Sequence, residues 1–141
     1  DVHKGFGLNF KITDLQAAMG NSQFKKLGKH IEGKKKLLNN YKNNISDEYK
    51  IIEFNKHEVP WFIDICFNSK SKRTNAKGKL DEQGIETRLS YPPLSKQKYL
   101  KKYANNNLNY SESVYEKILW MPSSINLTKK SISNICSVIN E

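Results

Sequence analysis

Residues 13–45 carry the one long periodic pattern of this sequence, and it limits the possible folds more than any other feature. Apolar side chains recur there at spacings of mostly three, four or seven residues, which is typical of one face of an α-helix. Thr13 and Gln16 fit a capping box at its start. We therefore expect one long helix over 13–45, preceded by an irregular segment at 1–12.

Three glycines interrupt this predicted helix, at positions 20, 28 and 33. A glycine in a helix interior costs about 1 kcal/mol relative to alanine. The glycines therefore indicate either a kink or close packing against a neighbouring element, and both require a partner surface.

The remaining residues, 46–141, alternate between strand-like and helical patterns. Stretches 49–54, 59–67 and 86–91 predict strands, and the second is apolar enough to be buried on both faces. We expect helices from about Lys72 to Gln83 with Gly84 as the C-terminal glycine, from Ser111 to Leu119, and after the cap residue Thr128. This alternation predicts an α/β (α+β) fold: a single domain over 1–141 in which helices cover a small sheet on one side.

The formal net charge of +10 raises the possibility of a nucleic-acid partner. However, only two of the 24 basic residues are arginines, Arg73 and Arg88, whereas base-edge and bidentate phosphate recognition favour the guanidinium group. Lysine and asparagine are plentiful throughout, so the charge reflects overall composition, and we expect no nucleic-acid partner.

Other function classes are excluded by missing motifs. The sequence has no Ser-His-Asp arrangement of the elbow type, no phosphate-binding GxxxxGK[ST] loop and no HExxH. Cys66 and Cys136 lie far apart and share no metal-ligand spacing with the histidines, so we expect buried thiols and no metal site. No run of about 18 apolar residues could span a bilayer, and the expected location is the cytoplasm.

Four blocks of the sequence carry a family resemblance. They are GFGLNFKITDLQAAMGNSQFKKL, VPWFIDICF, LDEQGIETRLSYPPLSKQKYL and ILWMPSSINLT. In this order and at suitable distances they resemble the DegT/DnrJ/EryC1/StrS family of sugar aminotransferases, and the second and third look most like its perosamine-synthase-like branch. The resemblance covers nearly the whole chain.

The resemblance implies that the chain is the C-terminal small domain of a fold-type I aminotransferase dependent on pyridoxal phosphate. In that family the large N-terminal domain holds the cofactor on a lysine, and that lysine precedes the segment found here. The complete homodimer would aminate a nucleotide-linked keto sugar of the 4-keto-6-deoxy type, with glutamate as amino donor, for surface polysaccharide. This chain alone would then hold no catalytic residue and be inactive.

Two residues are candidates for cofactor contact through the same resemblance. In the family, the turn before the long helix reaches the phosphate of the neighbouring subunit's cofactor, and the matching positions here are Asn9 and Lys11. An amide donor and a cation suit a phosphate dianion, although the family often has arginine where Lys11 stands. Alternatively, Lys11 is solvated and Asn9 only supports a turn.

The TRLSYPPLS loop supplies the substrate-binding candidates Arg88, Tyr91 and Ser95. Its two prolines would stiffen the loop and present these side chains to the sugar nucleotide or to the carboxylate of the amino donor. Many family members have histidine where Ser95 stands. The alternative has Tyr91 packed on the core and Arg88 paired with Glu82 or Glu86, and Trp61 and Trp120 are interpreted as core aromatics.

A function of another class also remains open. A stand-alone binding or regulatory module could keep the small-domain fold and lack catalysis.

Overall fold

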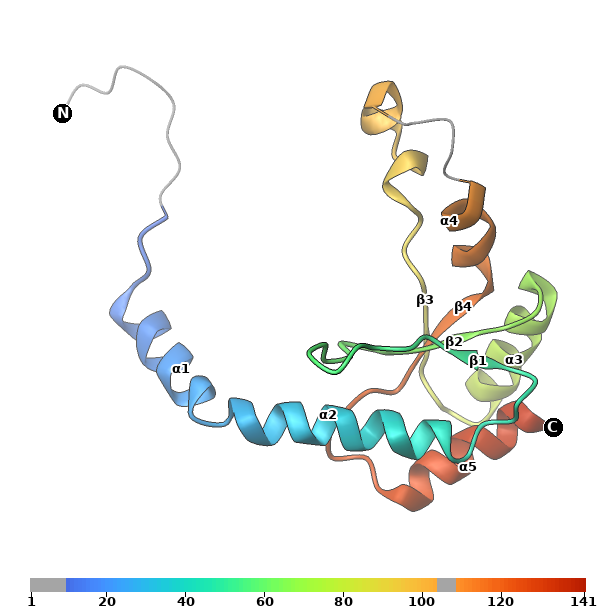
Figure 1. Cartoon of the computed structure of the whole chain (residues 1–141), viewed down its shortest axis with the longest axis horizontal. Coiled ribbons are helices and arrows are strands. Elements are labelled where there is room, and N and C mark those ends of the chain that lie inside the picture. The colour runs from blue at the N-terminus through green and yellow to red at the C-terminus, as the bar shows by residue number, and fades with distance from the viewer. Residues whose placement is uncertain (1–9, 104–108) are drawn as a thin grey trace.

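The structure is a computed structural model that describes residues 10–103 and 109–141. Figure 1 shows a small sheet with helices α2 and α5 crossing beneath it and helix α1 projecting away from it. The helices are α1 Asp14–Phe24, α2 Leu27–Lys42, α3 Lys70–Glu82, α4 Asn109–Val114 and α5 Lys129–Asn140, and the strands are β1 Lys50–Ile51, β2 Ile63–Cys66, β3 Arg88–Leu89 and β4 Ile118–Met121. Short 3-10 helices occupy Leu94–Lys96, Lys98–Tyr103 and Tyr115–Lys117.

The single long helix predicted over 13–45 is two helices in the structure. The capping box at Thr13 is confirmed, because the Thr13 side chain accepts from the Gln16 backbone and the Gln16 side chain accepts from Thr13. The helical ladder breaks at Lys25 and Lys26, and α2 ends at Lys42 rather than at 45. No residue of α1 is buried, so only α2 packs on the domain.

Helix α2 lies against the chain that follows β4. The Tyr41 hydroxyl donates to the Pro122 carbonyl at 2.9 Å, and the Lys34 ammonium donates to the Ser123 carbonyl at 2.6 Å. A Cβ added to Gly33 would lie 3.0 Å from Ile125, so glycine allows this close approach. The sequence expectation of close packing is therefore confirmed at Gly33.

The sheet has strand order β1-β2-β4-β3, and all neighbouring strands are antiparallel. In its centre, Ile63 lies opposite Met121 and Ile65 lies opposite Leu119. These four side chains are buried and share one face, because side chains alternate between the faces of a strand. The residues between them point to the other face of the sheet.

The core is formed by this face of the sheet together with α2, α3 and α5. Each helix contributes an apolar stripe, as expected of an amphipathic surface helix. Leu37, Leu38 and Tyr41 come from α2, Ala76 and Leu80 from α3, and Ile132, Ile135, Cys136 and Ile139 from α5. The prediction that helices cover a small sheet is thus confirmed. Burial raises the pKa of the Cys136 thiol to about 11.

Two local predictions are confirmed at helix ends and one is wrong. Thr128 caps α5 by accepting from the Ser131 backbone, and Gly84 follows α3 with φ of 69°, a conformation that glycine adopts without strain. The helix predicted from Ser111 to Leu119 ends early, because Ile118–Met121 pairs with β2 as strand β4. Cross-strand pairing here outweighs the helical pattern.

The expected double burial of the stretch 59–67 is only half observed. Ile63 and Ile65 are buried on the core face, while Asp64 and Cys66 on the other face are only partly buried. All three predicted strands are also shorter in the structure than the stretches 49–54, 59–67 and 86–91 that predicted them.

The contact at Gly33 predicts opposite effects for two glycines of the same helix. Gly28→Ala is expected to raise the free energy of unfolding by about 0.5–1 kcal/mol, because nothing lies within 4 Å of the added Cβ and alanine favours the helix. Gly33→Ala is expected to lower it by about 1 kcal/mol, because crowding against Ile125 exceeds that gain. Urea unfolding of both variants measures the difference, and equal gains would contradict the close approach.

The two threonine caps should also differ in their effect on stability. Thr128→Ala is expected to lower the free energy of unfolding by about 1 kcal/mol, because α5 supplies four core side chains. Thr13→Ala removes an equivalent cap from α1, which buries nothing, so it should leave global unfolding unchanged within about 0.3 kcal/mol. Thermal unfolding followed by circular dichroism compares them, and an equal loss in both variants would show that α1 belongs to the cooperative unit.

Candidate functional site

The face of the sheet opposite the core carries the candidate site. Arg88 of the edge strand β3 lies opposite Trp120 of β4, and Trp120 lies opposite Asp64 of β2. These three residues therefore share one face. Partial burial raises the pKa of Asp64, and a hydrogen bond from Trp120 partly offsets that rise.

Aromatic rings gather around Trp120 on this face. The Phe62 ring stacks on Trp120, with ring centres 4.5 Å apart and planes 3° apart. The Tyr91 ring meets Trp120 edge-on, with centres 4.8 Å apart. Such pairs add about 0.5–1.5 kcal/mol to the burial of the rings. We call Phe62, Arg88, Tyr91 and Trp120 the aromatic wall.

The structure brings two of the predicted substrate-site residues, Arg88 and Tyr91, into contact. The Arg88 guanidinium lies 5.7 Å from the centre of the Tyr91 ring, and its Nη2 lies 3.4 Å from the Tyr91 hydroxyl. Within the described part of the chain, no ion pair joins Arg88 to Glu82 or Glu86. Tyr91 is 56% exposed, so it does not pack in the core either. Both alternative interpretations are thus wrong, and the guanidinium remains exposed.

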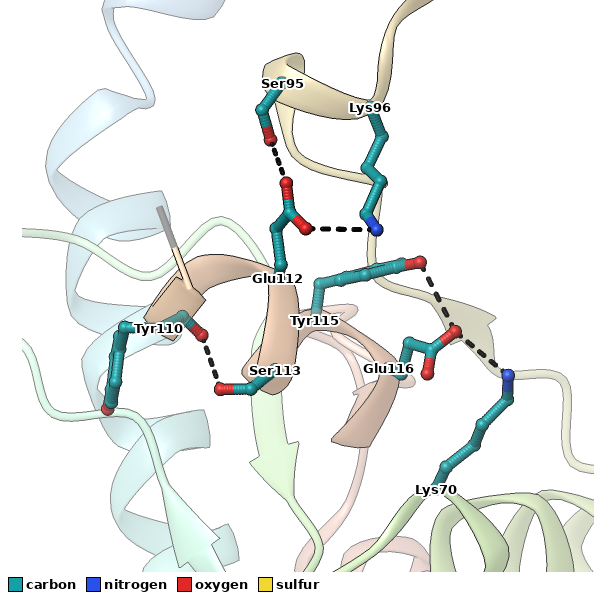
Figure 2. A network of polar contacts seen from close by, with 8 residues as sticks. All are labelled: Lys70, Ser95, Lys96, Tyr110, Glu112, Ser113, Tyr115 and Glu116. Carbon is teal, nitrogen blue, oxygen red and sulfur yellow. Dashed lines mark hydrogen bonds and ion pairs between the residues drawn. The ribbon is translucent and has the colours of Figure 1, made fainter. Parts of the chain in front are cut away.

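Ser95, the third substrate-site candidate, is held elsewhere. Its hydroxyl donates to Glu112 of α4 at 2.9 Å, and the Lys96 ammonium lies 3.1 Å from the other oxygen of that carboxylate. Figure 2 shows both side chains pointing toward Glu112. Hydrogen bonds from Lys96 and then from Ser95 keep the pKa of Glu112 below its ordinary value. Among the described residues, no hydrogen bond joins the Ser95 side chain to Arg88 or Tyr91, and its hydroxyl bonds to Glu112 instead.

A second carboxylate ties this region to α3. Glu116 lies 2.9 Å from the Lys70 ammonium and accepts from the Tyr115 hydroxyl at 3.3 Å (Figure 2). Its backbone carbonyl accepts from Nε of the buried Arg73 at 2.9 Å. One of the two arginines is therefore structural, and Arg88 is the one available for a ligand.

Of the two cofactor candidates, only Lys11 lies within the described residues. Asn9 falls outside the described residues. Lys11 is exposed and lies shortly before the cap residue of α1, and this helix projects away from the sheet (Figure 1). This chain therefore does not bring Lys11 together with Arg88, and its role at a cofactor stays a prediction.

Sequence reasoning missed Phe62 and Trp120 as site residues. Trp120 was expected in the core, but its ring faces the opposite side of the sheet, and Trp61, also expected in the core, is 73% exposed. The order of the residues along 59–67 and along 118–121 indicates which side chains of each strand share a face. The register that sets Trp120 between Asp64 and Arg88 does not follow from either stretch alone.

Metal and membrane sites find no support in the described residues. They contain no group of three or more His, Cys, Asp or Glu side chains that could hold a metal ion, and Cys66 and Cys136 are free thiols. No helix in ranges 10–103 and 109–141 is long and apolar enough to cross a membrane.

Comparison with known proteins identifies the family. The pattern of the DegT/DnrJ/EryC1/StrS aminotransferase family matches residues 1–140. GDP-perosamine synthase of Escherichia coli O157:H7 is 26% identical over 142 residues, which cover 99% of this chain and 38% of that protein.

Solved structures agree on the fold. A DegT DnrJ EryC1 StrS aminotransferase from Brucella abortus is 26% identical, with a TM-score of 0.78 over 89% of this chain and 34% of that one. A sugar aminotransferase from Streptococcus pneumoniae in its PMP form is 17% identical, with a TM-score of 0.77 over 92% of this chain and 34% of that one. This chain thus spans just over a third of such proteins and has the fold of the small domain expected from the sequence. Since the family pattern covers almost every residue, the chain belongs to the DegT/DnrJ/EryC1/StrS aminotransferase family.

Proposed function

We propose that the complete protein is a homodimeric aminotransferase that uses pyridoxal phosphate to aminate a nucleotide-linked keto sugar of the 4-keto-6-deoxy type. Glutamate would be the amino donor, and the product would be an amino sugar for surface polysaccharide. The family match over residues 1–140 carries this proposal. The names of the sugar-aminating relatives support the choice of substrate.

This chain would contribute one wall of the active site. The lysine that holds the cofactor and the large domain around it would lie outside residues 1–141, so this chain alone would be inactive. The alternative of a non-catalytic module differs in one respect: no such lysine would exist anywhere in the complete protein.

The residues near α1 fit a cofactor phosphate in chemical terms. Lys11 is an exposed cation on a projecting segment, and a lysine beside a phosphate forms charge-assisted hydrogen bonds. We place Lys11 and Asn9 at the phosphate of the neighbouring subunit's cofactor. When bound, pyridoxal phosphate would supply the electron sink of the reaction. The protein residues would anchor and orient it.

The aromatic wall would bind the substrate. Arg88 presents an exposed guanidinium that suits a phosphate or carboxylate oxygen. The ring and the hydroxyl of Tyr91 both contact this guanidinium. The Ser95 hydroxyl donates to Glu112 and still has a lone pair to accept a hydrogen bond from the sugar. The three substrate candidates would then act in two places, Arg88 with Tyr91 at the wall and Ser95 at the loop.

Removing the charge of Arg88 should weaken substrate binding in the complete enzyme. Arg88→Gln is expected to raise the KM for the sugar nucleotide about 10- to 100-fold, because it removes a charge-assisted contact. Arg88→Lys should recover only part of this loss, since the bidentate fork is absent. Steady-state kinetics of amine transfer measures both variants. Lys98→Gln removes an exposed charge elsewhere and serves as the control, and an unchanged KM in Arg88→Gln would contradict the role of Arg88.

The chain without its large domain should self-associate through α1. Leu15, Met19 and Phe24 are 73%, 63% and 72% exposed there, which leaves an apolar surface without cover. Leu15→Gln with Met19→Gln is expected to shift concentration-dependent sedimentation toward monomer, whereas Ser22→Gln on the same helix should not. A wild-type chain that stays monomeric at high concentration would count against a partner for this helix.

A further inference from the structure

The rings of Phe62 and Trp120 stack on each other, but the sheet positions only one of them directly. Trp120 lies within β4 and is paired with Asp64 on one side and Arg88 on the other. Phe62 lies one residue before β2, so the register of β2 with β4 begins only after it. The pairing of the two strands therefore does not by itself fix the backbone at Phe62.

The Lys34 side chain of α2 binds the backbone on one side of Phe62. Its ammonium donates to the Trp61 carbonyl at 2.7 Å and to the Ser123 carbonyl at 2.6 Å. The Trp61 carbonyl belongs to the peptide group that enters Phe62. Lys34 therefore joins this peptide group to the chain that follows β4, through bonds that are strong because the donor is charged.

Ser123 binds the backbone on the other side of Phe62. Its hydroxyl accepts from the Ile63 amide at 2.9 Å and donates to the Met121 carbonyl at 2.7 Å. The Ile63 amide belongs to the peptide group that leaves Phe62. Since a residue has only two soft backbone angles, holding both of its peptide groups fixes the direction of its side chain. We call Lys34 and Ser123, with these bonds, the backbone clamp.

The Lys34 ammonium is partly withdrawn from water in this position. Burial lowers the pKa of Lys34, because the charged form loses part of its hydration. A charge removed from water requires other polar partners, and the two carbonyls supply them. The adjacent Gly33 allows α2 to approach Ile125 closely, so the helix places the stem of Lys34 beside the chain that it binds.

We propose that Lys34 is a positioning residue of the aromatic wall, because its two carbonyl contacts hold the Phe62 ring on Trp120. Lys34 comes from α2, which packs on the core face of the sheet, whereas the stacked rings belong to the opposite face. A residue of the core side would thus set the shape of the candidate site. The clamp is a property of this chain, and its consequence for substrate binding rests on the proposed function.

The accessibility of Trp120 tests the clamp in the chain of residues 1–141 at low protein concentration. Trp61→Phe leaves Trp120 as the only tryptophan and keeps the carbonyl at position 61. In this background, Lys34→Met removes the ammonium and is expected to raise the acrylamide quenching constant of Trp120 about twofold, because a released Phe62 ring uncovers it. Lys34→Arg keeps a cation with several donors and should restore most of the protection.

Tyr41→Phe is the matched control for a general loss of stability. It removes a hydrogen bond from the same helix to the Pro122 carbonyl, next to Ser123, and leaves the clamp in place. The melting temperature is expected to fall by about 2–6 °C in both Tyr41→Phe and Lys34→Met. The quenching constant should rise only in Lys34→Met. An equal rise in both variants would overturn the proposal, because general loosening would then explain it.

A double-mutant cycle tests whether Lys34 acts through Phe62. Phe62→Leu removes the stacked ring and should raise the quenching constant at least as much as Lys34→Met does. Adding Lys34→Met to Phe62→Leu should change nothing further, because the ring that Lys34 holds is gone. Additive changes would refute the clamp.

Ser123→Ala tests the same clamp from its other side. It frees the Ile63 amide, so it should also uncover Trp120, and it keeps the clamp testable if Lys34→Met does not fold. Wild-type accessibility of Trp120 in the folded variants of Lys34 and Ser123 would overturn the proposal.

The consequence for substrate binding is measured in the complete enzyme. Lys34→Met is expected to raise the KM for the keto sugar nucleotide about 3- to 10-fold and to leave kcat within about twofold, because the wall would bind the substrate and take no part in the chemistry. Lys34→Arg should return KM toward the wild-type value. An unchanged KM in a variant with an uncovered Trp120 would overturn the link to substrate binding. A wild-type protein that transfers no amine would instead refute the proposed function.

Discussion

The pairing of β2 with β4 is the constraint on which the rest of the structure depends. It joins Ile63–Cys66 to Ile118–Met121 across more than fifty residues of chain and is the longest ladder in the described sheet. Because side chains alternate along both strands, this register assigns every residue of the ladder to a face. A shift by one residue would turn the isoleucines out of the core and Trp120 into it. The hydrophobic core and the candidate site are therefore set by the same pairing.

The two arginines of this chain have different roles in the structure. Arg73 is buried and donates to the carbonyl of Glu116, so its charge is used to fasten the segment after α4 to α3. Lysine could not easily replace it, since a guanidinium donates from a fixed plane close to its stem. Arg88 stands on the exposed face and has only a long contact with Tyr91. Its charge is thus available for a ligand.

Local signals in the sequence predicted local features well. The caps at Thr13 and Thr128 and the glycine turn at Gly84 depend on a few neighbouring residues, and all three are present. The helix expected through Leu119 failed, because its last residues gain more from pairing with β2 than from the helix. The glycines at 20, 28 and 33 indicated a kink only as one of two alternatives, and the position of the break after Phe24 was not predictable, since the lysines there are good helix formers. The partnership of Arg88, Trp120 and Asp64 depends on register between distant strands, so the sequence alone could not predict it.

The contacts of Ser95 explain how an exposed loop can still present Arg88 and Tyr91 in a fixed geometry. Exposed ion pairs such as Lys96 with Glu112 add little to global stability, because water and salt screen them. Their effect is local, because Glu112 bonds to two adjacent loop residues and so restricts the loop beyond the prolines. At the other end, the loop is fixed by the pairing of Arg88 with Trp120. A segment held at both ends loses less conformational entropy when a ligand binds, which favours a preorganised wall.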